Sequence, residues 1–248
     1  MQPTAILSAL AQEQHGLIER LHQPSQVTHA GRTFWRGSLQ GQPVVLVLAK
    51  LGKVAAATTT TALIERFDVQ RMVFTGVAGG LKSGVNVGDV VVGQCLLQHD
   101  LDVSPLFPRY EVPLYGKARF DADAQLTGAL LEASRAALAD AHLKSIYPDA
   151  KVHTGLIASG DRFVSGAAES SALRDALLAA GHDALAVEME GAAVAQVCHD
   201  YSLPFAVVRT ISDRADDTAH VDFPSFIDKV ASQYALTIIE KMLKLLLI

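Results

Sequence analysis

Short apolar runs, several of them rich in Val and Ile, recur along the whole chain and are separated by segments with helical patterning. Continuous apolar runs of this length are typical of strands that are buried on both faces of a sheet. We expect such strands at residues 5–9, 44–48, 72–74, 90–92, 152–157 and 205–208. Strands that alternate with helices predict a layered α/β fold.

Between these runs, apolar residues recur at the three- and four-residue spacing of amphipathic helices. We expect helices over residues 12–21, 54–67, 124–141, 167–180 and 189–201, and a last helix from Phe223 to Met242. An early segment, 27–47, has glycines between short strands and predicts antiparallel hairpins, which would make the sheet mixed. Because neither linker composition nor a repeat divides the chain, we expect residues 1–248 to form one domain.

Composition narrows the classes of partner. Half of the 248 residues are hydrophobic and the net charge is -5, which favours a large core and argues against a nucleic-acid groove or a basic membrane surface. No uncharged stretch reaches 18 residues and the N-terminus lacks a signal-peptide pattern, so neither a membrane span nor export is expected. Cys95 and Cys198 lie in apolar runs without a pairing pattern. We therefore expect a soluble cytoplasmic protein with a small-molecule ligand.

Polar or small residues follow several predicted strands, at the sheet edge where α/β proteins bind ligands. Glu13 comes four residues after the first strand and could activate a water molecule, or it could be a solvated acid in the first turn of a helix. The segment 75–80, Thr-Gly-Val-Ala-Gly-Gly, would let the backbone approach a ligand closely, or would form a tight turn without one. Its spacing matches neither a dinucleotide fingerprint nor a P-loop.

Three further segments could carry chemistry. Glu188 and Glu190 stand at a strand-to-helix corner, where carboxylates can accept hydrogen bonds from sugar hydroxyls, although Glu190 could merely favour the helix N-terminus. Asp213 could protonate a leaving group, or it could cap a turn or helix. Phe163 could stack on a planar base, or it could anchor a loop. The run His99-Asp100-Leu101-Asp102 lacks metal-ligand spacing, so no metal is expected.

Taken together, these segments resemble the purine and uridine phosphorylase superfamily, and within it the 5'-methylthioadenosine/S-adenosylhomocysteine nucleosidases. The resemblance covers nearly the whole chain and rests on the order and spacing of residues 8–13, 51–56, 75–80, 87–89, 159–164, 187–190 and 209–213. It implies a three-layer α/β/α nucleoside phosphorylase-like fold around a mixed, partly barrel-like central sheet. It also implies a homodimer that uses no cofactor and serves purine and methionine salvage.

The resemblance assigns roles to individual residues. Glu13 matches the general base that activates water, Asp213 the acid that protonates N7 of the departing base, and Glu190 the carboxylate that binds the ribose 2'-hydroxyl. Phe163 matches the aromatic residue that stacks on the base. Substrate contacts are further implied for Ala78, Gly79, Val164, Glu188, Met189, Ser212 and Phe226.

The same chemistry separates the rival functions. Cleavage of an N-glycoside passes through an oxocarbenium-like sugar, so carboxylates near the sugar and an acid at the base suit it. A phosphorylase would need cations for phosphate, and residues 8–14 and 75–80 contain no Lys or Arg. A non-catalytic nucleoside-binding module would lack at least one of the three catalytic carboxylates, and all three are present. The sequence therefore favours a hydrolase that releases adenine.

The segment 103–116 departs from the family, whose loop typically carries a Phe-Gly-Tyr type stretch followed by Gly-Gln-x-Pro-Gly. The choice among methylthioadenosine, S-adenosylhomocysteine, 5'-deoxyadenosine and other nucleosides is therefore open. Five of its side chains are apolar or aromatic: Leu106, Phe107, Tyr110, Leu114 and Tyr115. We expect this loop to form part of a homodimer interface and to cover the neighbour's 5' pocket.

Overall fold

The computed structural model describes residues 2–216, 219, 223 and 226–247. The strands are β1 (Thr4–Ser8), β2 (His22–His29), β3 (Arg32–Leu39), β4 (Gln42–Leu48), β5 (Arg71–Gly80), β6 (Val90–Gln98), β7 (Arg119–Asp121), β8 (Val152–Ser159), β9 (Ala184–Glu188) and β10 (Phe205–Asp213). The α-helices are α1 (Ala11–Glu19), α2 (Lys53–Phe67), α3 (Ala124–Leu138), α4 (Ala141–Ile146), α5 (Ala167–Ala179), α6 (Gly191–Asp200) and α8 (Ser232–Leu245). A π-helical turn, η1 (Ile227–Ala231), leads directly into α8.

These strands form one mixed sheet in the order β10-β6-β8-β9-β5-β1-β4-β3-β2, with β7 paired to β6. Strand β5 also pairs with β10, so the part of the sheet that runs from β10 through β9 to β5 closes into a ring. Strands β2, β3 and β4 form the antiparallel extension that the glycine-punctuated segment predicted. The expected mixed, partly barrel-like sheet is confirmed.

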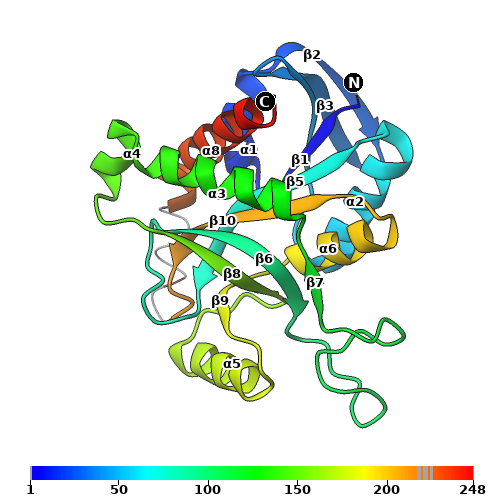
Figure 1. The fold of residues 1–248 in the computed structure, drawn as a ribbon, viewed down its shortest axis with the longest axis vertical. Helices are drawn as coiled ribbons and strands as arrows, with labels where there is room; N and C mark the ends of the chain where they lie inside the picture. The colour runs from blue at the N-terminus through cyan, green and yellow to red at the C-terminus, as the bar shows by residue number, and fades with distance from the viewer. Residues whose placement is uncertain (1, 217–218, 220–222, 224–225, 248) are drawn as a thin grey trace.

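Helices cover both faces of the sheet, which confirms the three-layer arrangement (Figure 1). Helices α1, α3 and α8 pack together on one face, and α2 and α6 pack together on the other. Alternate side chains of β1 serve the two cores: Ile6 packs with Leu17 and Ile238, whereas Leu7 joins the cluster on the α2 side. The apolar run at β1 is continuous because both of its faces are buried.

Three strands continue well beyond their apolar runs, and one of them, β6, was expected over residues 90–92 but reaches Gln98. The sequence predicted a strand end at residue 74, followed by a turn or ligand loop, but β5 extends to Gly80. Likewise β10 extends through Asp213, which ends the strand and also accepts from the Ala215 amide of the turn that follows. The physical reason is that β5 and β10 pair with each other in parallel from Thr75↔Val208 to Gly79↔Asp213, which satisfies the backbone of small and polar residues.

Other boundaries differ in smaller ways. The helix predicted to reach residue 141 ends at Leu138, because Asp140 caps the separate helix α4 by accepting from the His142 amide. Strand β2 begins at His22, earlier than the hairpin prediction. The predicted C-terminal helix, Phe223 to Met242, is helical at Phe223 and from Phe226 to Leu245, and its residues 224 and 225 lie outside the described residues.

The Pro-rich segment 103–116 is an ordered excursion, but its aromatic residues do not all face outward. Tyr110 is fully buried in its own chain and packs in a cluster with Leu97 and Leu156, so it is not among the side chains that the loop can offer to a partner. By contrast, Leu106 is 80% exposed and Leu114 is 93% exposed. The Tyr110 ring also meets the His182 ring edge-on, with the ring centres 5.8 Å apart, and this contact adds to its packing in the core.

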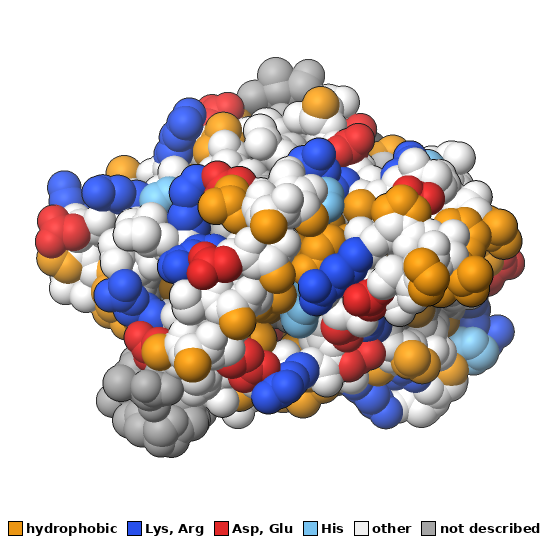
Figure 2. Space-filling model, turned by 90° about the horizontal axis from the view of Figure 1, so that it is seen from below, with side chains coloured by type: hydrophobic (Ala, Val, Ile, Leu, Met, Phe, Trp, Pro, Cys, Tyr) orange, Lys and Arg blue, Asp and Glu red, His pale blue; other side chains and the backbone are white. Residues whose placement is uncertain are grey.

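Side chains of both charges are mixed on the surface of the protein (Figure 2). Lys and Arg side chains are interspersed with Asp and Glu over the face seen from below, with small hydrophobic patches between them (Figure 2). In the part of the chain that the structure describes, none of the helices has the length and apolar character needed to cross a bilayer.

Candidate active site

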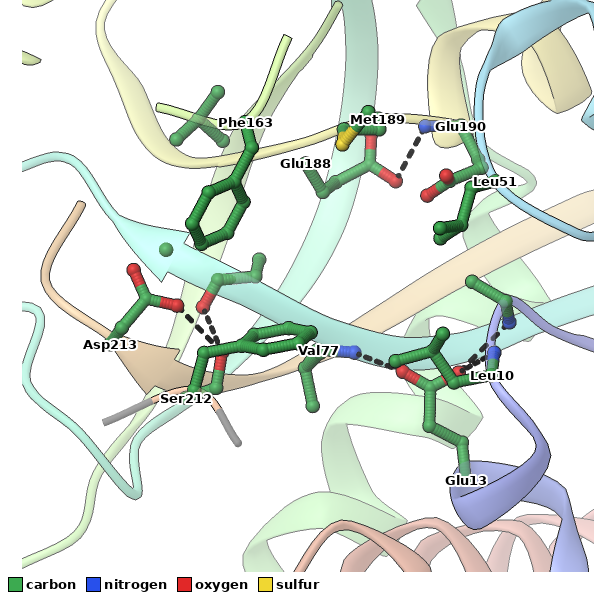
Figure 3. Close-up of a pocket in the computed structure, with 15 residues that line it drawn as sticks. Leu10, Glu13, Leu51, Val77, Phe163, Glu188, Met189, Glu190, Ser212 and Asp213 are labelled. Atoms are coloured by element: carbon green, nitrogen blue, oxygen red, sulfur yellow. Dashed lines mark hydrogen bonds between the residues drawn. The ribbon is translucent and has the colours of Figure 1, made fainter. Parts of the chain in front are cut away.

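A cavity of about 460 Å³ lies where the ends of β5, β9 and β10 meet the turn that follows β1. Fifteen residues line it: Ala9, Leu10, Glu13, Leu51, Val77, Ala78, Gly79, Phe163, Val187, Glu188, Met189, Glu190, Ser212, Asp213 and Phe223. Most of the sequence-predicted residues therefore meet here, although they come from segments far apart in the chain. Carboxylates stand at both ends of an otherwise mostly apolar cavity (Figure 3).

Glu13 lies in the first turn of α1 but is not a solvated acid, since only 1% of it is exposed. Its Oε2 accepts from the amides of Ala9 (2.8 Å) and Leu10 (2.9 Å), and its Oε1 accepts from the amide of Val77 (3.2 Å). Burial raises the pKa of Glu13, although these amides and a nearby Arg209 oppose that rise. A carboxylate held in this way, with a raised pKa, suits a general base.

Two glycines of β5 make room for two carboxylates. A β-carbon on Gly76 would lie 3.2 Å from Glu13 Oε1, and one on Gly79 would lie 2.9 Å from Asp213 Oδ1. The sequence suggested that small residues here let a ligand approach the backbone. In the structure they also let acidic side chains approach it.

Asp213 ends β10 and is 1% exposed. Its Oδ1 accepts from the amide of Ala215 and its Oδ2 accepts from the Ser212 hydroxyl, each at 2.8 Å. The Ser212 hydroxyl also lies 3.4 Å from the Ala78 carbonyl. These contacts fix the Asp213 carboxyl at one end of the cavity, next to Phe163 (Figure 3).

The two glutamates after β9 differ in their contacts. Glu190 directly precedes α6, and its Oε1 accepts from the Gly52 amide at 2.8 Å, so its role is not confined to the helix N-terminus. Burial, together with the charge of Glu188, raises the pKa of Glu190 to about 8. Glu188 has more hydrogen-bond partners within the protein: it accepts from the Ser159 hydroxyl and from the Gly191 amide, the latter at 2.9 Å.

Arg209 is a buried cation beside the cavity that the sequence did not single out. Its Nη2 donates to Glu188 Oε2 at 2.7 Å, its guanidinium lies 3.9 Å from the Phe74 ring centre, and only 1% of the residue is exposed. Its Nη1 is 3.5 Å from the position of a β-carbon on Gly76, close to Glu13. Although residues 8–14 and 75–80 contain no Lys or Arg, the nucleophile region does have a cation nearby, because β10 brings Arg209 there from a distant segment.

The ion pair between Arg209 and Glu188 compensates this cation. Removing one partner of a buried pair leaves an uncompensated charge and costs about 3–5 kcal/mol. Arg209 also donates to the carbonyls of Phe74 and Val208, both at 3.2 Å. The guanidinium is thus bound to the protein itself, and its charge lowers the pKa of Glu13 against the effect of burial.

Aromatic side chains complete the cavity. Phe163 is 42% exposed and meets Phe223 edge-on, with the ring centres 5.6 Å apart. Val164 lies beside the main cavity, in a small adjoining space that Phe163 and Asp213 also line. Phe226, which the resemblance put near the ribose, is 3% exposed and packs against Tyr147 and Tyr234.

The structure therefore does not bring Phe226 to the cavity, and Phe223 lies there in its place. The helical pattern of the sequence grouped both residues on one apolar stripe, so it gave no signal to separate them. Among the described residues, no group of three or more His, Cys, Asp and Glu is arranged to hold a metal ion.

A mixed, partly closed α/β sheet with a carboxylate-lined cavity at its strand ends defines the class of nucleoside-processing phosphorylase-like proteins. Residues 3–244 match the family model of the phosphorylase superfamily. The chain is 38% identical over 228 residues to the 5'-methylthioadenosine/S-adenosylhomocysteine nucleosidase of Bacillus thuringiensis, covering 92% of each chain.

Solved structures agree with this. The Neisseria meningitidis 5'-methylthioadenosine/S-adenosylhomocysteine nucleosidase, in complex with methylthio-immucillin-A, is 34% identical with a TM-score of 0.87, over 98% of this chain and 99% of that one. The Colwellia psychrerythraea nucleosidase, in complex with adenine, is 32% identical with a TM-score of 0.86, over 98% and 95%. The chain belongs to the phosphorylase superfamily and, within it, to the family of 5'-methylthioadenosine/S-adenosylhomocysteine nucleosidases.

Proposed function

We propose that this protein hydrolyses the N-glycosidic bond of adenine nucleosides of the 5'-methylthioadenosine, S-adenosylhomocysteine or 5'-deoxyadenosine type, a step of purine and methionine salvage. One observation carries the proposal. Asp213 and Phe163 lie at one end of a single cavity and Glu13 and Glu190 at the other (Figure 3). That spacing provides separate places for a planar base and for a sugar with its attacking water.

At the base end, Phe163 would stack on adenine, and stacking of a base on an aromatic ring contributes about 1–3 kcal/mol. Asp213 would donate a proton to N7, and its second oxygen would accept from the 6-amino group. At the sugar end, Glu190 would bind the 2'-hydroxyl. Val164 would offer backbone hydrogen bonds to the base, while Ala78, Gly79, Met189 and Glu188 would lie along the ribose.

The reaction then follows from proton positions. Glu13 takes a proton from water as the water oxygen bonds to C1', and the bond from C1' to N9 breaks. The electron pair leaves with the base, whose N7 receives the proton from Asp213, so a neutral adenine and a free ribose moiety result. Positive charge that develops on the sugar is stabilised by the nearby carboxylates.

Hydrolysis is favoured over phosphorolysis because the guanidinium nearest to Glu13 is already paired with Glu188. An incoming phosphate dianion would also meet the Glu13 carboxylate. Purified protein should convert 5'-methylthioadenosine to adenine and 5-methylthioribose equally with and without phosphate, as followed by product chromatography. Turnover that requires phosphate and yields a sugar 1-phosphate would replace this proposal with the phosphorylase alternative.

We also propose a homodimer formed through the segment 103–116. Leu106 and Leu114 support it, because two almost fully exposed leucines on one ordered loop favour burial against a partner. Replacing both by Asp should convert a dimer to a monomer in sedimentation, whereas Leu178→Asp, at a 57% exposed site on α5, should not. A wild-type protein that sediments as a fully active monomer would contradict the proposal.

The compartment we propose is the cytoplasm. Cys198 is a buried free thiol and Cys95 is a partly buried one. Free thiols of this kind suit a reducing environment.

A further inference from the structure

Outside the cavity, a chain of charged groups joins three loops, of which the first and the third supply cavity residues and the second links the other two. The first loop leads from β4 into α2 and contains Leu51 and Gly52, the second follows β6 at Asp100, and the third follows β8 and contains Asp161 and Phe163. None of these connections is part of the proposed proton transfers.

The ammonium group of Lys53 stands at the centre of this chain. Its Nζ lies 2.5 Å from Asp100 Oδ1 and donates to Gln98 Oε1 at 3.0 Å. Asp100 uses its other oxygen, Oδ2, to accept from the Asp161 amide at 2.9 Å. Asp161 Oδ1 in turn accepts from the Lys53 amide at 2.7 Å, which closes the circuit of Lys53, Asp100 and Asp161.

The circuit lies at the N-terminus of α2, where successive backbone amides have no partners within the helix. Gly52 and Lys53 donate these amides to two different carboxylates: Gly52 to Glu190 inside the cavity and Lys53 to Asp161 outside it. Gly52 has a φ of +88°, and a β-carbon there would lie 3.1 Å from Asp161 Oδ1, so position 52 requires glycine. The amide that holds Glu190 and the amide that holds Asp161 are therefore fixed together.

Partial burial strengthens these contacts. The Lys53 side chain is only 16% exposed and that of Asp100 is 32% exposed. Burial alone would raise the pKa of Asp100, but the Lys53 ammonium and the Asp161 amide hold that pKa below its usual value. Gln98 extends the circuit to α6, because its Nε2 donates to Gln196 Oε1 at 2.8 Å.

We infer that Lys53 and Asp100 are positioning residues for substrate binding, which hold the Gly52 amide against Glu190 and hold Phe163, two residues after Asp161, over the cavity. The inference deepens the proposed function and rests on it for its kinetic consequences. It predicts an effect on nucleoside binding that exceeds the effect on the chemical steps, since neither residue lines the cavity.

The test compares Lys53→Met and Asp100→Asn with Lys53→Arg and with a matched control, Lys82→Met. Lys82 forms a comparable ion pair with Asp183, but on exposed surface away from the cavity. For 5'-methylthioadenosine, Lys53→Met and Asp100→Asn should raise KM about tenfold with a change in kcat below about threefold. Lys53→Arg should recover most of the loss, and Lys82→Met should match the wild type.

A second measurement keeps the test independent of activity. In hydrogen–deuterium exchange on the intact chain, the amides of Gly52, Lys53 and Asp161 should exchange about tenfold faster in Lys53→Met and at the wild-type rate in Lys82→Met. Unchanged exchange at these amides would overturn the positioning role. So would wild-type KM values in Lys53→Met accompanied only by a lower Tm. A wild-type protein that cleaves no nucleoside would overturn the proposed function, while exchange would still decide on the circuit.

Discussion

The carboxylate of Asp213 lies directly against Gly79 of the neighbouring strand, so that a single β-carbon at position 79 would come within 2.9 Å of Oδ1 and 3.0 Å of the Ala215 β-carbon. The two residues face each other in the register between β5 and β10. Gly79 thus lines the cavity and also makes room for the proposed acid.

Gly79→Ala should therefore displace the Asp213 carboxyl. Because small displacements of reacting groups are costly, we expect kcat to fall by about 10²-fold, with a loss of about 1–3 kcal/mol in the free energy of unfolding from overpacking. The control is Gly128→Ala in α3, where a β-carbon would meet nothing within 4 Å. This control should keep wild-type kinetics and gain up to about 1 kcal/mol in stability. Equal kinetics in the two variants would contradict the steric account.

Asp213→Asn should keep the fold and much of the binding but lose proton transfer to N7. Asn can present its amide to N7, yet it does not readily release a proton. We expect kcat to fall by about 10²–10⁴-fold. Steady-state kinetics on adenine nucleosides, together with adenine binding measured by calorimetry, check this. Near-normal turnover would mean that Asp213 is structural only, and the adenine assignment would have to be withdrawn.

Glu13→Gln should lose water activation to a similar extent, about 10²–10⁴-fold in kcat, with nucleoside binding retained. It should also lower stability. All three amides around Glu13 are donors, so the new side-chain NH₂ group must face one of them, most simply that of Val77. A buried donor without an acceptor costs about 1–3 kcal/mol, which urea unfolding would measure. Full activity in this variant would remove Glu13 from the mechanism.

The raised pKa of Glu190 predicts how the free energy of unfolding depends on pH. Its pKa in the folded protein is about 8, above the ordinary 4.5, so the folded state holds a proton that the unfolded state releases. The contribution of the Glu190 proton to the free energy of unfolding is complete below pH 4.5 and is lost as the pH rises through 8. Between these values the free energy of unfolding should fall by about 1.4 kcal/mol per pH unit from this group alone.

Glu190→Gln should flatten that slope, because Gln does not titrate and its carbonyl can still accept from the Gly52 amide. Glu13, whose pKa is also raised, should leave part of the slope in place. Urea unfolding at pH 5.5, 6.5 and 7.5 in both proteins compares the slopes directly. Identical slopes would show that Glu190 does not carry the proton.

Much of this protein could be predicted from local pattern. Continuous apolar runs and helical periodicity depend on neighbouring residues, and they located the buried strands and most helices to within a few positions. The order of the short motifs also predicted the family and the candidate acids Glu13, Glu190 and Asp213. The ends of β5 and β10 were missed because the stability of their small and polar residues depends on pairing with a strand from a distant segment.

Tertiary structure alone decided how those residues act together. Arg209 reaches the region of Glu13 and pairs with Glu188 only because β10 lies beside β5, and nothing in the local sequence shows that contact. The stripe that holds Phe223 and Phe226 has one periodicity, yet Phe223 enters the cavity and Phe226 enters the core. The sequence determined which side chains were available, whereas packing between distant segments determined their partners, because burial and charge pairing act across space rather than along the chain.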